Sequence, residues 1–458
     1  MKGHSYKAGI FLKDESRADW HDKTLWMVRQ KRDKAARSVA DWEDLRERAS
    51  SIKEQVLSNL DFYLSEFEQR AVENGVKVHR ASDAQEFNEI VYKIVTDNNA
   101  KLVVKSKSML TEECGLNTFL EQRGLEVVDT DLGERIIQFR KEPPSHIVLP
   151  AIHLKKEEIG ELFHEKLNTP KGMSDPVLLT SAARTHLREK FLSAGVAITG
   201  VNFAVAETGS VVVCTNEGNA DMGVHAAPVQ IHCMGIEKLV PQTRDLAVFT
   251  RLLARNATGQ PITAYTSHYR KPKPRGEMHI VIVDNGRSDR LKSDIHRSSL
   301  KCIRCGACMN TCPVYRRSGG HSYGYLIPGP IGSILAPSYN IKKHTDLPFA
   351  SSLCMSCSNV CPVKIDIHDQ LYKWRQELSE KGAFSPVKGL VLKIAGFILS
   401  KSALYDFSGK VARVALKWLP RRMVYSKINV WGWERELPAV PQESFKKWYS
   451  KNSGKNNL

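Results

Sequence analysis

Seven of the ten cysteines lie in two short runs in the last third of the chain. These are Cys302, Cys305, Cys308 and Cys312, and then Cys354, Cys357 and Cys361. A proline directly follows the last cysteine of each run. Thiolates are soft ligands that suit iron and bridging sulfide, and the first run has the C-x₂-C-x₂-C-x₃-C-P spacing of proteins that carry two iron–sulfur clusters. The cysteines therefore predict two such clusters.

The spacing also predicts which cysteine binds which cluster. Three thiolates at positions i, i+3 and i+6 can wrap one face of a cluster, whereas a fourth cysteine before a proline starts a helix, points away and ligates the other cluster. Gly306, between two ligands, would let backbone N–H groups approach the inorganic sulfurs. One cluster is expected on Cys302, Cys305, Cys308 and Cys361, and the second on Cys312, Cys354 and Cys357.

The second cluster lacks one thiolate in this pattern. When the second run is aligned with the first, the missing cysteine falls at Ser351. Three arrangements remain open: a [3Fe–4S] cluster, a [4Fe–4S] cluster whose last iron takes the Ser351 hydroxyl, or one whose last iron takes water or a ligand from elsewhere. A hydroxyl or water ligand would change the reduction potential and the lability of the cluster.

Two other uses of cysteine fit the pattern less well. Structural zinc sites use pairs of C-x-x-C motifs and four ligands per ion, not a triple followed by Cys-Pro. Structural disulfides need an oxidising compartment, and the N-terminal residues contain no apolar stretch of signal-peptide length. We therefore expect a cytoplasmic protein with reduced thiols.

Length and charge limit the remaining possibilities. A chain of 458 residues is too long for one hydrophobic core, so several domains are expected. The 67 basic and 50 acidic residues give a net charge of +17, which suits an acidic protein partner or an anionic membrane, or simply a highly charged surface. No motif that reads nucleic acid accompanies this charge, so nucleic acid is not expected as a partner.

Four regions are expected to position the cysteines. The helical spacing of apolar residues predicts a helical region at residues 1–75, and the basic stretch Arg29–Arg37 is expected to face solvent. Residues 76–287 alternate short apolar runs with amphipathic helices, which predicts an α/β domain with a largely parallel sheet. Residues 288–380 then form a helical cluster domain, and residues 381–458 form a basic helical tail.

Within the α/β region, apolar runs predict strands at 102–104, 125–128, 136–139, 147–149, 196–199, 203–205, 210–213, 229–232 and 279–283. Helices are expected at 84–95, 110–123, 155–167, 178–194 and 246–254. The glycine- and proline-rich run 328–332 in the cluster domain is expected to be a loop.

One loop of this region is a candidate ligand site. Lys105–Ser108 follows a strand and precedes a helix, where α/β folds place ligand loops. Its lysines and the helix N-terminus would suit a small anion, and a plain polar loop is the alternative.

The tail contains two basic segments that carry apolar residues. Leu390–Leu399 is apolar but interrupted by Lys393, and it is shorter than the ~18 residues of a membrane span. Together with Val411–Leu419 it predicts an interfacial helix on anionic lipid, or else a segment that packs against the cluster domain or a partner subunit.

With these residues in view, the chain resembles the lactate utilisation protein B family, iron–sulfur proteins of bacterial L-lactate oxidation. The resemblance rests on the α/β region with Glu207-Thr-Gly-Ser210, the two cysteine runs and the basic tail. It implies a lactate-utilisation α/β domain similar in fold to the CoA-transferase and ribose-5-phosphate-isomerase group. It also implies an α-helical ferredoxin-type two-cluster domain, similar to those of glycolate oxidase, succinate dehydrogenase and heterodisulfide reductase subunits, in which the seven cysteines hold two [4Fe–4S] clusters.

The resemblance further implies two partners, a sister iron–sulfur subunit and a small lactate-utilisation-domain subunit. Together such proteins convert L-lactate to pyruvate and allow growth on lactate. No G-x-G-x-x-G fingerprint of a flavin or nicotinamide site opens a helix in this chain, and no catalytic acid or base stands out. We therefore expect an electron-transfer subunit rather than the catalyst itself. A subunit for glycolate or another 2-hydroxy acid, and a cluster-bearing redox sensor or scaffold, are the alternatives.

Overall fold

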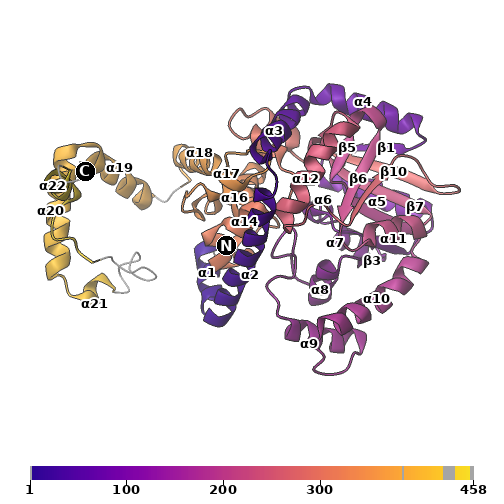
Figure 1. The fold of residues 1–458 in the computed structure, drawn as a ribbon, viewed down its shortest axis with the longest axis horizontal. Coiled ribbons are helices and arrows are strands. Elements are labelled where there is room, and N and C mark those ends of the chain that lie inside the picture. Colours follow the sequence, from indigo (N-terminus) through magenta and orange to yellow (C-terminus); the bar gives the residue numbers. More distant parts are fainter. Residues whose placement is uncertain (1–2, 384–385, 426–438, 454–458) are drawn as a thin grey trace. The chain divides into compact units, whose positions relative to one another are not determined.

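The computed structural model describes residues 3–383, 386–425 and 439–453 (Figure 1). The chain divides into two compact units between Glu377 and Leu378. None of the described helices is both long enough and apolar enough to cross a lipid bilayer.

The first unit begins with helices that pack against the cluster region and against the α/β domain. They are α1 (His4–Leu12), α2 (Glu15–Arg37), α3 (Trp42–Ser58) and α4 (Leu60–Glu73). Leu25 of α2 and Leu45 of α3 are buried in the same hydrophobic core as five of the cluster cysteines. Helix α2 contacts α14 and α15 of the cluster region as well as α12 of the α/β domain (Figure 1). The N-terminal helices therefore join the two parts of this unit.

The larger of the two sheets that the structure describes is parallel throughout, with strand order β1-β10-β7-β4-β2-β3. Its strands are β1 (Lys77–Ala81), β2 (Leu102–Lys105), β3 (Glu126–Asp129), β4 (Val196–Gly200), β7 (Val229–Gly235) and β10 (Glu277–Val283). Successive strand residues enter different cores: Ile280 and Ile282 face one core and Val281 faces the other. The sheet is therefore covered on both faces, as parallel sheets usually are.

A second sheet has the order β8-β5-β6-β9. It consists of β5 (Phe203–Val205), β6 (Ser210–Thr215), β8 (Leu239–Val240) and β9 (Tyr265–Tyr269). The Glu207-Thr-Gly-Ser210 motif forms the turn between β5 and β6, where Gly209 has φ +64°. A Cβ atom on Gly209 would lie 2.3 Å from the Ala71 backbone nitrogen, so glycine allows this turn to pack against α4.

The helices of the α/β domain are α5 (Ala84–Asp97), α6 (Met109–Glu113), α7 (Leu116–Glu121), α8 (Leu132–Arg140), α9 (Lys156–Leu167), α10 (Pro176–Ser193), α11 (Asn219–Ala226) and α12 (Leu246–Ala257). Side-chain caps fix several of their starts. Asp83 accepts the backbone N–H of Glu86 at 2.9 Å, and Asp175 accepts that of Val177 at 2.9 Å before α10.

Two predicted strands are wrong. Residues 136–139 lie in α8, because Asp131 caps a helix there by accepting the N–H of Glu134 at 3.2 Å. Residues 147–149 form a turn, because the backbone N–H groups of Val148 and Leu149 donate to Nδ1 of His146 at 3.0 and 3.1 Å. The predicted helix 110–123 is divided at Gly115, which has φ +67°.

The cluster region consists of short helices separated by turns. They are α13 (Arg287–Leu291), α14 (Ala307–Thr311), α15 (Pro313–Ser318), α16 (Gly329–Tyr339), α17 (Ser356–Val360) and α18 (Ile367–Glu380). The loop predicted for residues 328–332 is wrong, because α16 begins there. Pro330 lies in its first turn, where no N–H is needed. Gly332 lets the helix approach closely, since its Cβ would lie 1.5 Å from the Ile327 carbonyl oxygen.

The second unit contains α19 (Pro386–Ser400), α20 (Ser402–Trp418), α21 (Arg421–Val424) and α22 (Phe445–Asn452). Both apolar segments predicted in the tail are therefore helical. Helix α20 buries no side chain, and α19 exposes large apolar side chains, namely Val387, Leu390, Val391, Leu392, Ile394, Phe397 and Leu399.

Candidate iron–sulfur centre and adjoining cavity

The two cysteine runs fold into matching loops. Helices α14 and α17 each follow a residue in the left-handed backbone region, Gly306 at φ +75° and Met355 at φ +64°. Two residues earlier, Arg304 and Leu353 are also left-handed, at φ +61° and +54°. The two loops can therefore be superposed residue by residue, with Gly306 on Met355.

This superposition places Ser351 where the first loop has Cys302. The backbone N–H of Arg304 donates to Sγ of Cys302 at 3.4 Å. In the second loop the N–H of Leu353 donates to Oγ of Ser351 at 3.1 Å. A hydroxyl thus takes the hydrogen bond that a thiol takes in the first loop.

The seven thiols differ in exposure. Cys302 is partly buried and packs against the core, whereas Cys354 is exposed. The other thiols are buried in a single hydrophobic core: Cys305, Cys308, Cys312, Cys357 and Cys361. Most of the thiols are therefore enclosed by the protein, whereas Cys354 lies at the surface.

The electrostatic influence of one thiol on another shows which of them are neighbours. Burial raises the pKa of Cys308 well above its usual value, and Cys302, Cys305 and Cys361 raise it further. Burial raises the pKa of Cys357 to about 12, with a further contribution from Cys312 and Cys354. Cys357 also acts on Cys308, so the two groups adjoin. These mutual effects match the two predicted groups, Cys302, Cys305, Cys308 and Cys361 in one and Cys312, Cys354 and Cys357 in the other. Among the described residues, no three such donors are spaced to bind a single metal ion.

Backbone N–H groups are directed at the thiols that precede the prolines. Tyr315 donates to Cys312 Sγ at 3.5 Å, and Ile365 donates to Cys361 Sγ at 3.4 Å. Burial raises the pKa of both thiols to about 11, while these N–H groups oppose the rise. Buried thiols that accept backbone N–H groups suit iron–sulfur clusters, because such hydrogen bonds stabilise the negative charge on sulfur. The residues present therefore fit the two predicted clusters.

Two arginines of the N-terminal helices support the second cysteine run. Arg46 donates from Nε and Nη2 to the Cys361 carbonyl oxygen at 3.0 and 2.8 Å. Arg32 donates from Nη2 to the Val360 carbonyl oxygen at 3.1 Å. Both arginines are only 7% exposed. The expectation that Arg29–Arg37 faces solvent is therefore wrong at Arg32. The contact of Arg46 with the cluster loop was not predicted, because no sequence pattern indicates it.

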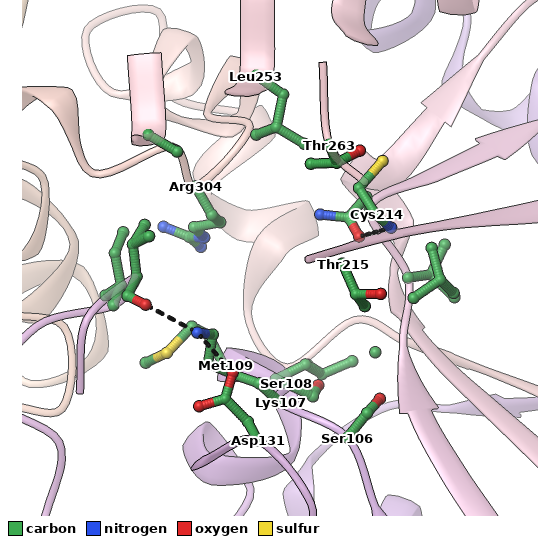
Figure 2. A pocket seen from close by; sticks show the side chains of 18 of the residues that line it. Ser106, Lys107, Ser108, Met109, Asp131, Cys214, Thr215, Leu253, Thr263 and Arg304 are labelled. Atoms are coloured by element: carbon green, nitrogen blue, oxygen red, sulfur yellow. Dashed lines mark hydrogen bonds and ion pairs between the residues drawn. The ribbon is translucent and has the colours of Figure 1, made fainter. Parts of the chain in front are cut away.

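A cavity of about 290 Å³ lies between the α/β domain and the first cysteine loop (Figure 2). One wall comes from residues at the carboxyl ends of strands, including Ser106 after β2, Gly200 of β4 and Gly235 of β7. The opposite side includes Arg304, which lies between Cys302 and Cys305. Ligands commonly bind outside the carboxyl ends of strands in α/β sheets, and here that position adjoins the first cysteine loop.

The predicted anion loop contributes to this cavity only in part. Ser106, Lys107 and Ser108 line it, but Lys105 does not. The Lys105 side chain is fully buried and its Nζ lies 2.8 Å from carboxylate oxygens of both Glu112 and Asp129. Lys105 is therefore a structural charge, and its expected role as an anion ligand is wrong.

Several charges around the cavity neutralise one another. Arg287 pairs with Glu113 at 3.0 Å and with Glu237 at 2.7 Å. Although burial would raise the pKa of Glu237, the charges of Arg287, Lys238 and Arg304 lower it to about 2. Lys107 lies 3.3 Å from Asp131 and donates to the Val148 carbonyl oxygen at 2.8 Å (Figure 2).

Comparison with known proteins agrees with this architecture. The LUD domain family matches residues 64–291, and the 4Fe-4S dicluster domain family matches residues 298–365. The chain therefore combines an α/β domain built on a parallel sheet with a domain for two iron–sulfur clusters and a helical C-terminal region, as predicted. A duf162 family protein of Deinococcus radiodurans aligns with 49% of this chain and 98% of its own length at 15% identity, with a TM-score of only 0.28.

Curated relatives match over nearly the whole length. Lactate utilization protein B of Oceanobacillus iheyensis is 44% identical over 91% of this chain and 90% of its own. The Bacillus subtilis protein of the same name is 42% identical over 92% and 91%. An uncharacterized electron transport protein of Escherichia coli is 40% identical over 92% and 90%. The chain therefore belongs to the lactate utilisation protein B family.

Proposed function

We propose that this chain is the iron–sulfur electron-transfer subunit of a complex that oxidises L-lactate to pyruvate and so allows growth on lactate. The match to a 4Fe-4S dicluster domain and the names of the close relatives support this role. The observation that carries the proposal is the pair of adjoining thiol groups in one apolar core, of which one reaches the surface.

The ligand assignment follows from the grouping of the thiols. Cys302, Cys305, Cys308 and Cys361 would hold the first cluster, and Cys312, Cys354 and Cys357 the second. When bound, the clusters supply one-electron redox chemistry. The chain would hold them against one hydrophobic core, in which five of the thiols are buried, and it directs N–H groups at the sulfurs of Cys312 and Cys361. The two groups adjoin through Cys308 and Cys357.

The exposure of Cys354 suggests a direction for the relay. The first thiol group is enclosed and adjoins the cavity through Arg304. The second group reaches solvent at Cys354, where a partner could come close enough to exchange electrons. We propose that the sister iron–sulfur subunit and the small lactate-utilisation-domain subunit are the partners, and that one of them docks over Cys354.

Anaerobic purification followed by iron and sulfide analysis and low-temperature EPR tests the cluster assignment. A deletion strain complemented with this chain tests the substrate, since it should grow on L-lactate and lose that growth when Cys305 is replaced by serine. A growth defect on glycolate but not on L-lactate would instead assign the subunit to another 2-hydroxy acid. Unimpaired growth of the deletion strain on both acids would favour a redox sensor or scaffold.

The second unit supports a finer proposal about location. We propose that it contacts anionic membrane surfaces peripherally. Helix α19 exposes Leu390, Ile394 and Phe397 beside the basic residue Lys401, and α20 adds Lys410 and Lys417. Apolar side chains that enter the headgroup region next to basic residues are typical of interfacial helices.

A further inference from the structure

Two cationic side chains meet the cavity without a partner. Arg304 and Lys238 both line it, and in the part of the chain that the structure describes neither side chain makes a hydrogen bond or an ion pair. Nη1 of Arg304 is buried and unsatisfied. A buried donor without a partner costs free energy, and the cost is greater when the donor is charged. An anion in the cavity would satisfy both groups.

Carboxylates around the cavity act on these two cations, since Glu237 opposes the fall in the pKa of Lys238 and, with Glu113, raises the pKa of Arg304, but among the described residues neither cation forms an ion pair with them. Glu237 and Asp131 are taken by Arg287 and Lys107, as described above. Glu217 accepts the backbone N–H of Leu132 at 3.1 Å. Burial and then the neighbouring Asp131 raise the pKa of Glu217 to about 7, so it offers only a partial negative charge near neutral pH.

A neutral donor in the same cavity is also unsatisfied. Ser106 is 5% exposed and its hydroxyl has no partner among the described residues. It comes from the loop after β2, opposite Arg304 of the cluster domain (Figure 2). The donors therefore come from both domains and face the same space.

We propose that this cavity binds a small organic carboxylate of the 2-hydroxy or 2-oxo acid class, directly beside the first cluster-binding loop. The inference rests on the proposed function and names the substrate-class ligand of this subunit. A planar guanidinium matches a carboxylate in a two-pronged arrangement, which Arg304 offers, and Lys238 adds a second charge. The Ser106 hydroxyl suits the oxygen on the second carbon, and Met109 and Leu253 supply apolar walls for a short carbon chain.

The alternative is that Arg304 and Lys238 only balance the negative charge of the cluster. Both side chains feel the charge of Cys302, although burial has the largest effect on the pKa of each. A counter-ion role alone would lower the reduction potential of the first cluster when Lys238 is neutralised, without any effect on carboxylate binding. The two roles therefore differ in a binding measurement.

The test is calorimetric titration of the anaerobically purified, cluster-loaded chain with sodium L-lactate and with sodium pyruvate. Acetate and inorganic phosphate are titrated at the same ionic strength. We expect saturable binding of lactate and pyruvate. Acetate, which has no oxygen on its second carbon, should bind more weakly, and phosphate should bind no better than acetate.

Lys238→Gln is the diagnostic variant and Lys301→Gln is its control. Lys301 is adjacent to Cys302 in the sequence but pairs with Glu54 at 2.7 Å and does not line the cavity. Lys238→Gln should weaken lactate binding roughly 10- to 100-fold, the loss expected for one hydrogen bond to a charged group. Lys301→Gln should bind as the wild type does, with equal iron content in all three proteins.

A second measurement needs no variant. Lactate should protect Lys238 of the wild-type chain from acylation by an amine-reactive reagent, as mapped by mass spectrometry, and should leave the exposed Lys292 unprotected. Absence of saturable lactate and pyruvate binding, or a Lys238→Gln variant that binds lactate normally, would overturn the proposal. In that case intact clusters and lactate-dependent growth would still support the proposed electron-transfer role, so the two failures are distinguishable.

Discussion

Ser351 holds the position in the second loop that Cys302 holds in the first. Its hydroxyl accepts the backbone N–H of Leu353, just as the Cys302 thiol accepts the backbone N–H of Arg304 in the first loop. Serine oxygen is a harder ligand than thiolate and suits iron in a cluster less well. If Ser351 binds the second cluster, we therefore expect it to be a weaker ligand than a cysteine at the same position.

Replacement of Ser351 by cysteine should complete the second set of thiolates. We expect the EPR signal of the second cluster to change, its bleaching in air to become slower, and the signal of the first cluster to stay the same. Ser352→Cys is the matched control, since it adds a thiol to the exposed neighbouring position. Equal effects of both variants would show that position 351 is no closer to the cluster than any nearby thiol.

A second prediction at the scale of single residues follows because each cysteine run is expected to supply one ligand to the cluster of the other run. Cys361 belongs to the second run in sequence but neighbours Cys302 and Cys305. Cys361→Ser should therefore alter the EPR signal of the first cluster and spare that of the second. Cys357→Ser should do the reverse, and Cys214→Ser, outside both runs, should change neither. An identical spectrum for the two ligand variants would contradict the assignment.

At the scale of elements, the N-terminal helices hold the cluster loops in place. Arg46 of α3 donates twice to the carbonyl of Cys361, and Arg32 of α2 donates once to that of Val360. Both carbonyls flank a cluster cysteine. Without the arginines, a buried acceptor at the end of α17 would lose its partner.

Arg46→Ala should destabilise the protein by about 1–3 kcal/mol, because it removes charged hydrogen bonds to a buried carbonyl group. Thermal unfolding of the cluster-loaded chain measures the loss, and cluster release on heating should occur earlier. Arg48→Ala, at an exposed position on the same helix, is the control and should change stability little. A variant at Arg46 that unfolds like the control would mean that these bonds contribute nothing to holding the loop.

Sequence patterns predicted the elements that carry strong periodicity and missed those that depend on side chains from elsewhere. The buried strands of the parallel sheet were found because both of their faces are apolar. The edge strands β1 and β9 were missed because they carry polar residues such as His79 and Ser267. Residues 147–149 looked like a strand, but the side chain of His146 takes their N–H groups.

The residues of the site also fall into those that sequence patterns could predict and those that they could not. Cysteine spacing points to ligands because a cluster needs thiols at fixed intervals along the chain. The cavity has no such signature, since Lys238 and Arg304 lie on different domains and come together only in the folded chain. Lys105 was misjudged because its partners Asp129 and Glu112 follow it at intervals that form no recognisable motif.

At the scale of the whole molecule, the two proposed clusters would connect the cavity to the surface of the first unit. Arg304 belongs both to the cavity wall and to the loop that carries Cys302 and Cys305. The first thiol group adjoins the second, and the second reaches solvent at Cys354. An anion site at one end and an exposed cluster at the other would let one subunit respond to a carboxylate and pass electrons to a partner.

The second unit is expected to bind an anionic membrane surface. The full chain should bind vesicles that contain anionic lipid, bind neutral vesicles weakly, and release from the anionic ones as salt is raised. Ile394→Asp with Phe397→Asp should weaken binding roughly 10-fold or more, because the large exposed side chains of α19 would no longer enter the interface.

Leu178→Asp, at an exposed apolar position of the first unit, is the control and should bind normally. Vesicle co-sedimentation measures all of these. Equal binding to neutral and anionic vesicles, or loss of binding in the control alone, would contradict a role of the tail in binding anionic membrane.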